Sequence, residues 1–188
     1  ATVLSSPNFL YLSQTQHSAG DNQVNEHVKD ERLATRLAIF LWCSTPDDEL
    51  LTLDAEGKLT DPDILISQTK RMLADPKSER LSRHFVRQWL GMQLLDYLDV
   101  DRKSYPHFDR YLKESMQEEP VAFFHDVLQQ NHSVVVFIHA DYTMVDHRLA
   151  GHYGLAKIYG NHFRKVQLSP GDRRGGLLTQ AGLLAMNS

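Results

Sequence analysis

The sequence contains a single cysteine, Cys43, and this scarcity excludes several kinds of chemistry within these residues. One cysteine forms no intrachain disulfide, supplies no cluster of zinc-binding thiolates and provides no C-x-x-C-H site for covalent haem attachment. Cys43 lies in an apolar segment beside Trp42, without a basic neighbour in the sequence. Because a reactive thiol needs a nearby positive charge to lower its pKa, we expect Cys43 to be buried and inert.

Long hydrophobic runs are also missing. The longest purely apolar run covers residues 37–43, far short of the roughly 20 residues that a membrane-spanning helix needs. The 20 Lys and Arg residues against 24 Asp and Glu residues give a net charge of −4, which argues against a dedicated nucleic-acid-binding protein. With 41% hydrophobic and 23% charged residues among 188, the composition predicts a soluble globular protein rather than a disordered or fibrous one.

Recognisable catalytic and metal-binding motifs are absent as well. The sequence has no G-x-S-x-G, and none of its ten histidines lies three or four residues from another. A helix therefore cannot present two imidazoles to one metal ion from adjacent turns. We expect mostly surface histidines and no metal ligands, although a site assembled from distant elements stays open. The acidic residues Glu114, Glu118 and Glu119 are interpreted as a solvated helix face.

The starts of several helices are legible in the sequence. In four places a residue with a capping side chain comes directly before a proline: Ser6-Pro7, Thr45-Pro46, Asp61-Pro62 and Asp75-Pro76. Proline suits the first position of a helix because its missing N–H would have no partner there, and the preceding oxygen accepts from the next free amides. Each of these pairs predicts the start of a helix.

Apolar residues recur at helical spacing in three segments. Such spacing places side chains on one face of a helix, which then packs against the core. Pro120 interrupts the last segment, and we expect it to kink the helix or to end its first half. The stripes are Leu33, Leu37, Phe40 and Leu41 in residues 30–44; Leu81, Phe85, Trp89 and Met92 in the next segment; and Phe108, Leu112, Met116, Phe123, Phe124, Val127 and Leu128 in residues 108–130.

The remaining segments are less regular. Residues 13–29 are polar and predict a surface loop, and the apolar run 134–138 fits either a short strand or a helical turn. Residues 163–168 alternate weakly and precede a Ser-Pro-Gly-Asp sequence that suits a type II turn, so we expect a small β-hairpin there. With a last helix over 179–188, the patterns predict a mainly α fold, an irregular bundle of about six to eight helices with a small β-hairpin near the C-terminus.

The densest polar segment, residues 139–154, contains candidates for a functional side chain. A helix beginning near Asp141 or Thr143 would place His152 on the apolar face, partly buried. Asp141 would then be the N-cap and Gly154 the C-cap. Structural hydrogen bonding explains a histidine in such a place more often than catalysis does.

The last forty residues are basic, whereas the rest of the chain is acidic. Residues 149–188 carry five Lys and Arg residues against one Asp, a net charge of +4, so residues 1–148 total −8. The glycine-rich segment 171–176 fits a turn with solvated arginines, and the alternative is anion binding, although the segment lacks the G-K-[ST] ending of a P-loop. Docking of an acidic partner here should weaken as the salt concentration rises. The candidate contacts to an anion or a partner are Arg164, Lys165, Arg173 and Arg174.

Several strings of the sequence together carry a resemblance to a known family. They are Ser6-Pro7-Asn8-Phe9-Leu10-Tyr11; Leu33-Ala34-Thr35-Arg36-Leu37; Phe40-Leu41-Trp42; Pro46-Asp47-Asp48-Glu49-Leu50-Leu51; Met72-Leu73-Ala74-Asp75-Pro76; Gln88-Trp89-Leu90-Gly91; Ala140-Asp141-Tyr142-Thr143; and Arg174-Gly175-Gly176-Leu177-Leu178-Thr179-Gln180. As a set, these strings resemble the domains of unknown function found in large planctomycete-type secreted proteins that also carry a c-type cytochrome module. The resemblance covers nearly the whole chain.

The resemblance implies a division of the chain into two parts. We expect a helical domain of unknown function over residues 1–159 and the truncated beginning of a following module over residues 160–188. The resemblance also implies that haem c is attached in another module, so no cofactor is expected within these residues. It implies an exported or periplasmic protein, whose signal peptide we expect to have been removed or to lie outside these residues, and whose natural chain we expect to continue beyond Ser188.

Two hypotheses of function follow. The first is a non-catalytic helical structural or interaction module of a larger exported multidomain protein associated with a c-type cytochrome. Its partners would be other domains of the same polypeptide, such as a cytochrome c module, rather than nucleic acid. The alternative is part of an oxidoreductase or hydrolase whose active site forms with further domains. The resemblance supplies no catalytic residue, so Asp141, His152 and Arg174 are the first residues to test.

Overall fold

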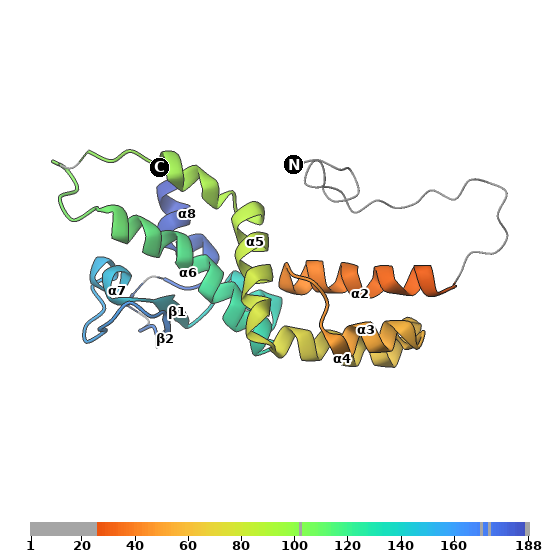
Figure 1. The fold of residues 1–188 in the computed structure, drawn as a ribbon. Coiled ribbons are helices and arrows are strands. Elements are labelled where there is room, and N and C mark those ends of the chain that lie inside the picture. The colour runs from red at the N-terminus through yellow and green to blue at the C-terminus, as the bar shows by residue number, and fades with distance from the viewer. Residues whose placement is uncertain (1–25, 102, 170, 173, 187–188) are drawn as a thin grey trace, which may run out of the picture.

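The structure of the chain is a computed structural model that describes residues 26–101, 103–169, 171–172 and 174–186. These residues form seven α-helices, several short 3₁₀ helices and a two-stranded sheet (Figure 1), which confirms the mainly helical fold with a small antiparallel sheet near the C-terminus. The α-helices are α2 (Glu26–Trp42), α3 (Asp48–Ala55), α4 (Pro62–Ala74), α5 (Glu79–Trp89), α6 (Arg110–Gln129), α7 (His147–Tyr153) and α8 (Ala181–Met186). The 3₁₀ helices are η1 (Lys58–Thr60), η2 (Pro76–Ser78), η3 (Met92–Tyr97), η4 (Val134–Phe137) and η5 (Leu177–Thr179), and the strands are β1 (Tyr142–Val145) and β2 (Arg164–Gln167).

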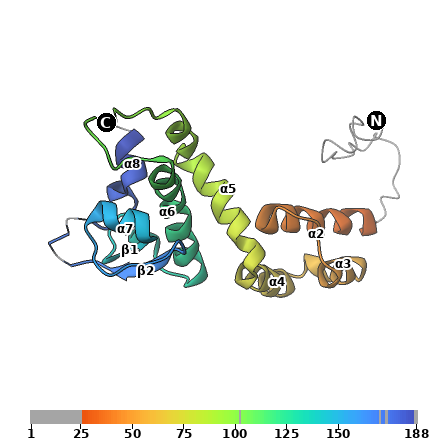
Figure 2. The same cartoon turned by 60° about the vertical axis from the view of Figure 1, so that its left-hand side comes forward.

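The helices form two lobes joined by α5 (Figures 1 and 2). Helices α2, α3 and α4 make the first lobe, whose core includes Trp42 and Met72. Helices α6, α7 and α8 and the sheet make the second lobe, whose larger core includes Phe123, Val145 and Leu149. Because α5 packs against α2 in one lobe and against α6 in the other, it connects the two hydrophobic cores.

The predicted helix starts agree with the structure at two of the proline pairs. Asp61 caps α4, with its carboxylate accepting hydrogen bonds from the backbone N–H groups of the first turn and with proline as the first helical residue. Asp75 caps η2 in the same way, and this 3₁₀ turn leads directly into α5. The helix predicted after Thr45-Pro46 is present as α3, but it starts at Asp48, and its N-cap is Asp47 rather than Thr45. The Asp47 carboxylate also pairs with Arg71 at 2.7 Å. The pair at Ser6 lies outside the described residues.

Helix α2 buries the expected stripe in part: Leu41 is in the core and Leu33 and Leu37 pack against it, but Phe40 does not. Its core side chains are small or near its end, Ala34, Ala38, Leu41 and Trp42, whereas Phe40 is exposed. The Trp42 indole N–H donates to the Met72 carbonyl at 2.9 Å and so ties the end of α2 to α4. Cys43 was predicted to be buried, but it is exposed. The helix ends at Trp42, and Cys43 itself has a positive φ of 48°, so the backbone changes direction there and the side chain no longer lies on the apolar face of the helix. The loop predicted over 13–29 is helical from residue 26 onward, and its earlier part lies outside the described residues.

The stripe predicted for α5 is also met in part: Leu81 packs against the core of the first lobe and Met92, just after the helix, is buried, but the two aromatic residues are not. Ser82 and Val86 are buried, while Phe85 and Trp89 are 44% and 50% exposed. A small residue at position 82 lets α5 approach α6, and the Ser82 hydroxyl lies 3.0 Å from His125 Nδ1 of that helix. The two large aromatic side chains are therefore left at the surface rather than in the core.

Helix α6 continues through Pro120, so the proline does not end the first half of the helix, which was one of the two outcomes expected. Proline has no N–H to donate to the carbonyl one turn earlier, that of Met116. The backbone of α8 approaches this carbonyl at Gly182, where a Cβ atom would lie only 2.6 Å from Met116 O. The proline and the glycine therefore lie where the backbones of α6 and α8 come close together.

The sheet pairs β1 with β2 in antiparallel register, with Tyr142 opposite Gln167 and Val145 opposite Arg164. The predicted strand near 163–168 is present, but its partner is the segment for which the sequence predicted a helix. Asp141 is consequently not an N-cap. Asp146 caps α7 instead, accepting from Leu149 N at 2.9 Å, while Gly154 is the C-cap as predicted.

Candidate functional site

A buried carboxyl group lies at the centre of the second lobe. Glu119 of α6 is 0% exposed, and both of its oxygens accept hydrogen bonds. Thr143 Oγ1 of β1 donates to one oxygen at 2.7 Å, and the Tyr153 hydroxyl of α7 donates to the other at 2.6 Å. Burial raises the pKa of Glu119 to about 7, against the lowering effect of these two hydrogen bonds and of the positive charge of Arg174. This glutamate therefore titrates near neutral pH.

Tyr153 connects Glu119 to the C-terminal helix. While its hydroxyl donates to the glutamate, it also accepts from the Ala181 backbone N–H at 2.8 Å, the first residue of α8. Burial, followed by the neighbouring charge of Glu119, raises the pKa of the phenol, so the hydroxyl keeps its proton. One side chain thus joins α6, α7 and α8.

Arg174 covers the outer side of this network. Its guanidinium lies 3.8 Å from the centroid of the Tyr153 ring, and its Nη1 donates to the Thr179 carbonyl at 3.1 Å. The adjacent glycines are needed for the close approach of two backbones. A Cβ on Gly175 would lie 2.1 Å from Ala140 O and one on Gly176 would lie 2.5 Å from the Ile138 carbonyl oxygen, and both glycines have positive φ.

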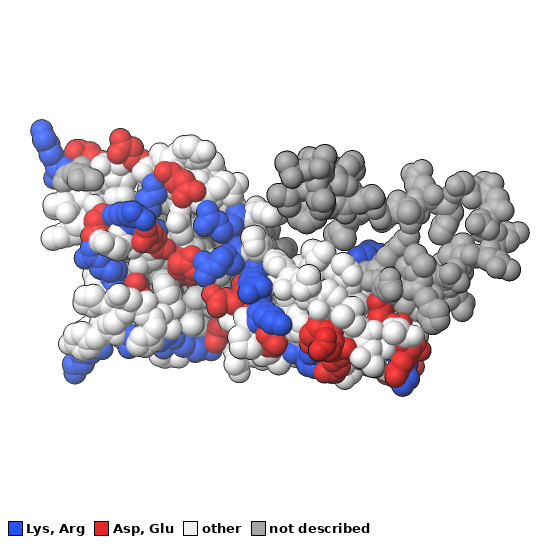
Figure 3. All heavy atoms as spheres, in the orientation of Figure 1, with Lys and Arg blue, Asp and Glu red and all other residues white. Residues whose placement is uncertain are grey.

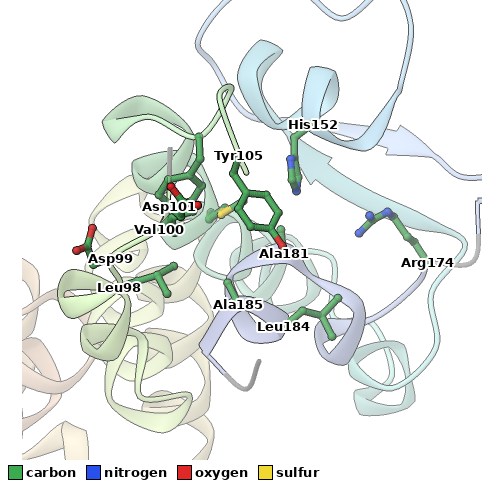
Figure 4. Close-up of a pocket in the computed structure, with 12 residues that line it drawn as sticks. Leu98, Asp99, Val100, Asp101, Tyr105, His152, Arg174, Ala181, Leu184 and Ala185 are labelled. Atoms are coloured by element: carbon green, nitrogen blue, oxygen red, sulfur yellow. The ribbon is translucent and has the colours of Figure 1, made fainter. Parts of the chain in front are cut away.

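A cavity of about 490 Å³ opens next to Arg174 (Figure 4). Its walls come from the segment after η3, from α6, from α7 and from α8. His152 and Arg174 lie together at one end, and Asp99 and Asp101 lie toward the other. The lining is mostly apolar: Leu98, Val100, Tyr105, Phe108, Met116, Ala181, Leu184 and Ala185, beside the four polar residues. A concave apolar space with a few polar groups at its ends is the usual form of a small-molecule site.

A second feature lies on the surface between α5, α6 and η4. Four rings touch one another there, and we call them the aromatic surface: Phe85, Trp89, Phe124 and Phe137. The Phe85 centroid is 5.5 Å from Trp89 and 5.2 Å from Phe124, and Phe124 stacks on Phe137 at 5.6 Å with the ring planes 8° apart. Phe137 belongs to η4, and three further apolar side chains in or directly after η4 are exposed: Val134, Val135 and Ile138.

Comparison with known proteins gives a family for the chain. Residues 28–155 match the family described as PSD4, protein of unknown function (DUF1592). The chain belongs to the DUF1592 family. The match includes Glu119, Tyr153 and the aromatic surface, whereas Arg174 and α8 lie beyond it. No curated protein and no solved structure matches the chain.

Of the three residues singled out for a test, Arg174 shares one cavity with His152 and another with Asp141. In this DUF1592 protein Arg174 lines the cavity with His152, and it also lines a second cavity, of about 540 Å³, with Asp141 and His139. By surface area, His152 is exposed rather than partly buried. Its imidazole is still partly desolvated beside the cavity, and this desolvation, followed by the charge of Arg174, lowers its pKa. Asp141 is exposed, and its backbone carbonyl accepts from Leu168 N at 2.7 Å beside the sheet.

Most of the side chains predicted to contact an anion or a partner interact with other residues of this chain. Lys165 pairs with Asp126 at 3.0 Å and lies over the Tyr142 ring, and Arg164 donates to the Tyr159 carbonyl. Arg173 lies outside the described residues. On the face drawn in Figure 3, Lys and Arg side chains are interspersed with Asp and Glu over the second lobe, so the basic and acidic parts of the sequence do not appear there as separate surfaces.

Glu119 was missed because the sequence groups it with two exposed neighbours. Glu114 pairs with Arg110 at 2.7 Å and Glu118 with Arg83 on the outside of α6, but Glu119 points into the core, so its interpretation as a solvated residue is wrong. A signal was present in the sequence, since position 119 follows Leu112 and Met116 at spacings of seven and three. It therefore lies on the apolar face.

The part of the chain that the structure describes holds no group of three or more His, Cys, Asp or Glu side chains arranged to bind a metal ion. Among its helices, none combines the length and the apolar character that crossing a bilayer requires.

Proposed function

We propose that this DUF1592 chain is a non-catalytic helical interaction module of a larger exported multidomain protein. In this proposal it docks against another domain of the same polypeptide, and haem c is carried by a separate cytochrome module. The export and the cytochrome association rest on the resemblance of the sequence strings, and the docking rests on the aromatic surface.

The aromatic surface is the observation that carries the proposal. Trp89 and Phe85 keep about half of their surface exposed, although the rings that they contact, Phe124 and Phe137, pack against the core of the second lobe. Exposed aromatic side chains that touch one another are costly to leave in water, and aromatic residues dominate the energetics of protein interfaces. Two exposed and two partly buried rings from three elements form a preorganised apolar site for a partner domain.

The polar residues of the second lobe support a non-catalytic role. Each Glu119 oxygen accepts a hydrogen bond, and the Tyr153 hydroxyl both donates and accepts. The carboxyl group itself has no contact with solvent. Groups that are fully engaged with one another hold α6, α7 and α8 together, and such an arrangement is typical of a structural network.

Binding between this chain and the remainder of its polypeptide, produced separately, tests the proposal. Isothermal titration calorimetry should give an affinity that falls roughly tenfold or more in Trp89→Ser, because the ring anchors the apolar contact. Tyr97→Ser is the matched control, since Tyr97 is exposed in η3 and lies outside the aromatic surface. An unchanged affinity in a folded Trp89→Ser protein would contradict the proposal.

A further inference from the structure

The cavity beside Arg174 combines a cation at one end with apolar walls. The guanidinium lies half-buried at the boundary between cavity and network, and its hydrogen bond within the described chain goes to a backbone carbonyl, Thr179 O. None of the ion pairs found among the described residues includes Arg174. Glu119, the nearest buried carboxyl group, is directed at Tyr153 and Thr143 instead. The charge of Arg174 acts on Glu119 but forms no ion pair with a carboxylate of the described residues. A half-buried arginine of this kind, facing a cavity, leaves donors directed at whatever occupies that space.

The walls next to this cation are suited to an apolar chain or ring. Phe108 and Met116 come from the α6 side, and Leu184 and Ala185 come from α8. Tyr105 projects over the cavity opposite α8 (Figure 4). Contact with these side chains would remove apolar ligand surface from water, which is the main source of affinity in such cavities.

The far end of the cavity sets a limit on the ligand. Asp99 and Asp101 lie there, away from Arg174 (Figure 4). The carboxylate of Asp101 is held in place by Lys103 N at 2.9 Å and Ser104 Oγ at 2.9 Å. A second negative charge on the ligand would be repelled by these two carboxylates.

We propose that this cavity binds an amphipathic monocarboxylate. The carboxylate group pairs with the Arg174 guanidinium beside His152, and the apolar part of the ligand lies between Phe108 and α8. This function is separate from docking through the aromatic surface, because the two sites share no side chain.

Three probes of equal chain length test the ligand chemistry by isothermal titration calorimetry on the full chain. Decanoate should bind, decanol should bind at least about tenfold more weakly because it has no charge to pair with Arg174, and decanedioate should also bind more weakly because of the aspartates. Equal binding of decanoate and decanol, or no binding of decanoate below its micelle-forming concentration, would overturn the proposal. Binding of decanedioate as tight as that of decanoate would overturn the assignment of a monocarboxylate.

Two variants with matched controls locate the site. Arg174→Gln should weaken decanoate binding about tenfold or more, whereas Arg110→Gln, at an exposed position outside the cavity, should not. Because Arg174 also packs on Tyr153, its replacement can disturb the network as well as the cavity, so a second variant is needed. Leu184→Glu places a negative charge in the cavity, at an exposed position, and should weaken decanoate binding. Leu94→Glu is its control, exposed in η3 and outside the lining. Unchanged decanoate affinity in folded Leu184→Glu protein contradicts the proposal.

Discussion

At the scale of single residues, Glu119 makes the stability of the fold depend on pH. Its carboxyl group is completely buried and receives two hydroxyl hydrogen bonds, and its pKa is raised to about 7 from 4.5 because burial disfavours the charged form. The folded state therefore holds a proton at pH values where the unfolded chain has released it. The stability associated with this group is fully present below about pH 4.5 and is lost as the pH rises toward 7.

Replacing this glutamate should remove that pH dependence. The free energy of unfolding of the wild-type protein should fall between pH 4.5 and pH 7 relative to that of Glu119→Gln, by an amount on the order of 2 to 3 kcal/mol. Urea unfolding at several pH values measures the difference. Glu114→Gln, in the same helix but on its exposed side, should follow the wild-type curve, and a constant difference between wild type and Glu119→Gln across this range would show that Glu119 is not protonated on folding.

The position of Glu119 on the apolar face of α6 could be predicted from spacing alone, but its partners could not. Thr143 and Tyr153 are 24 and 34 residues away in the sequence and come from β1 and α7. Which hydroxyl reaches a buried carboxyl depends on how the strand and the helix pack, and no local pattern encodes that. The exposure of Cys43 is a similar case, since it depends on a backbone turn one residue after a helix ends.

At the scale of elements, local capping rules succeed where no tertiary contact competes. Asp61 caps an exposed helix start as its sequence predicts, whereas Asp47 takes the place of Thr45 because its carboxylate also binds Arg71. Around β1 the local preference for a helix is overruled by pairing with β2. Asp146, and not Asp141, then satisfies the first turn of α7, and it accepts from the Ser115 hydroxyl at 2.7 Å as well.

The two aspartates provide a direct comparison of the predicted and observed caps. Asp146→Ala should lower the free energy of unfolding by about 2 kcal/mol, because α7 loses its cap and a buried hydrogen bond to α6 is lost. Asp141→Ala should change it by less than about 0.5 kcal/mol, since that side chain is exposed. Chemical denaturation of both variants measures the difference. Equal losses of unfolding free energy in the two variants would contradict the assignment of Asp146 as the cap of α7.

At the scale of the whole molecule, the second lobe includes residues from beyond the range of the family match. Strand β2 completes the sheet, and Leu177, Ala181 and Leu183 enter the same core as Phe123 and Val145. The sequence assigned residues 160–188 to the start of a following module, on the basis of the resemblance and the charge distribution. That boundary stays a prediction, because residues can pack against a neighbouring module and still belong to a separate folding unit.

Two adjacent leucines in η5 distinguish an integral segment from a separately folding one. Leu177 is 4% exposed and Leu178 is 69% exposed, so both changes to alanine remove the same atoms from the same turn. Leu177→Ala should lower the free energy of unfolding by about 2 to 4 kcal/mol, and Leu178→Ala by less than about 0.5 kcal/mol. Hydrogen exchange should show the loss of protection spreading from α8 into α6 and α7, because these helices share the core that contains Leu177. If the loss were confined to residues 160–188 while α6 and α7 stayed protected, the C-terminal segment would be a separate unit, as the sequence predicted.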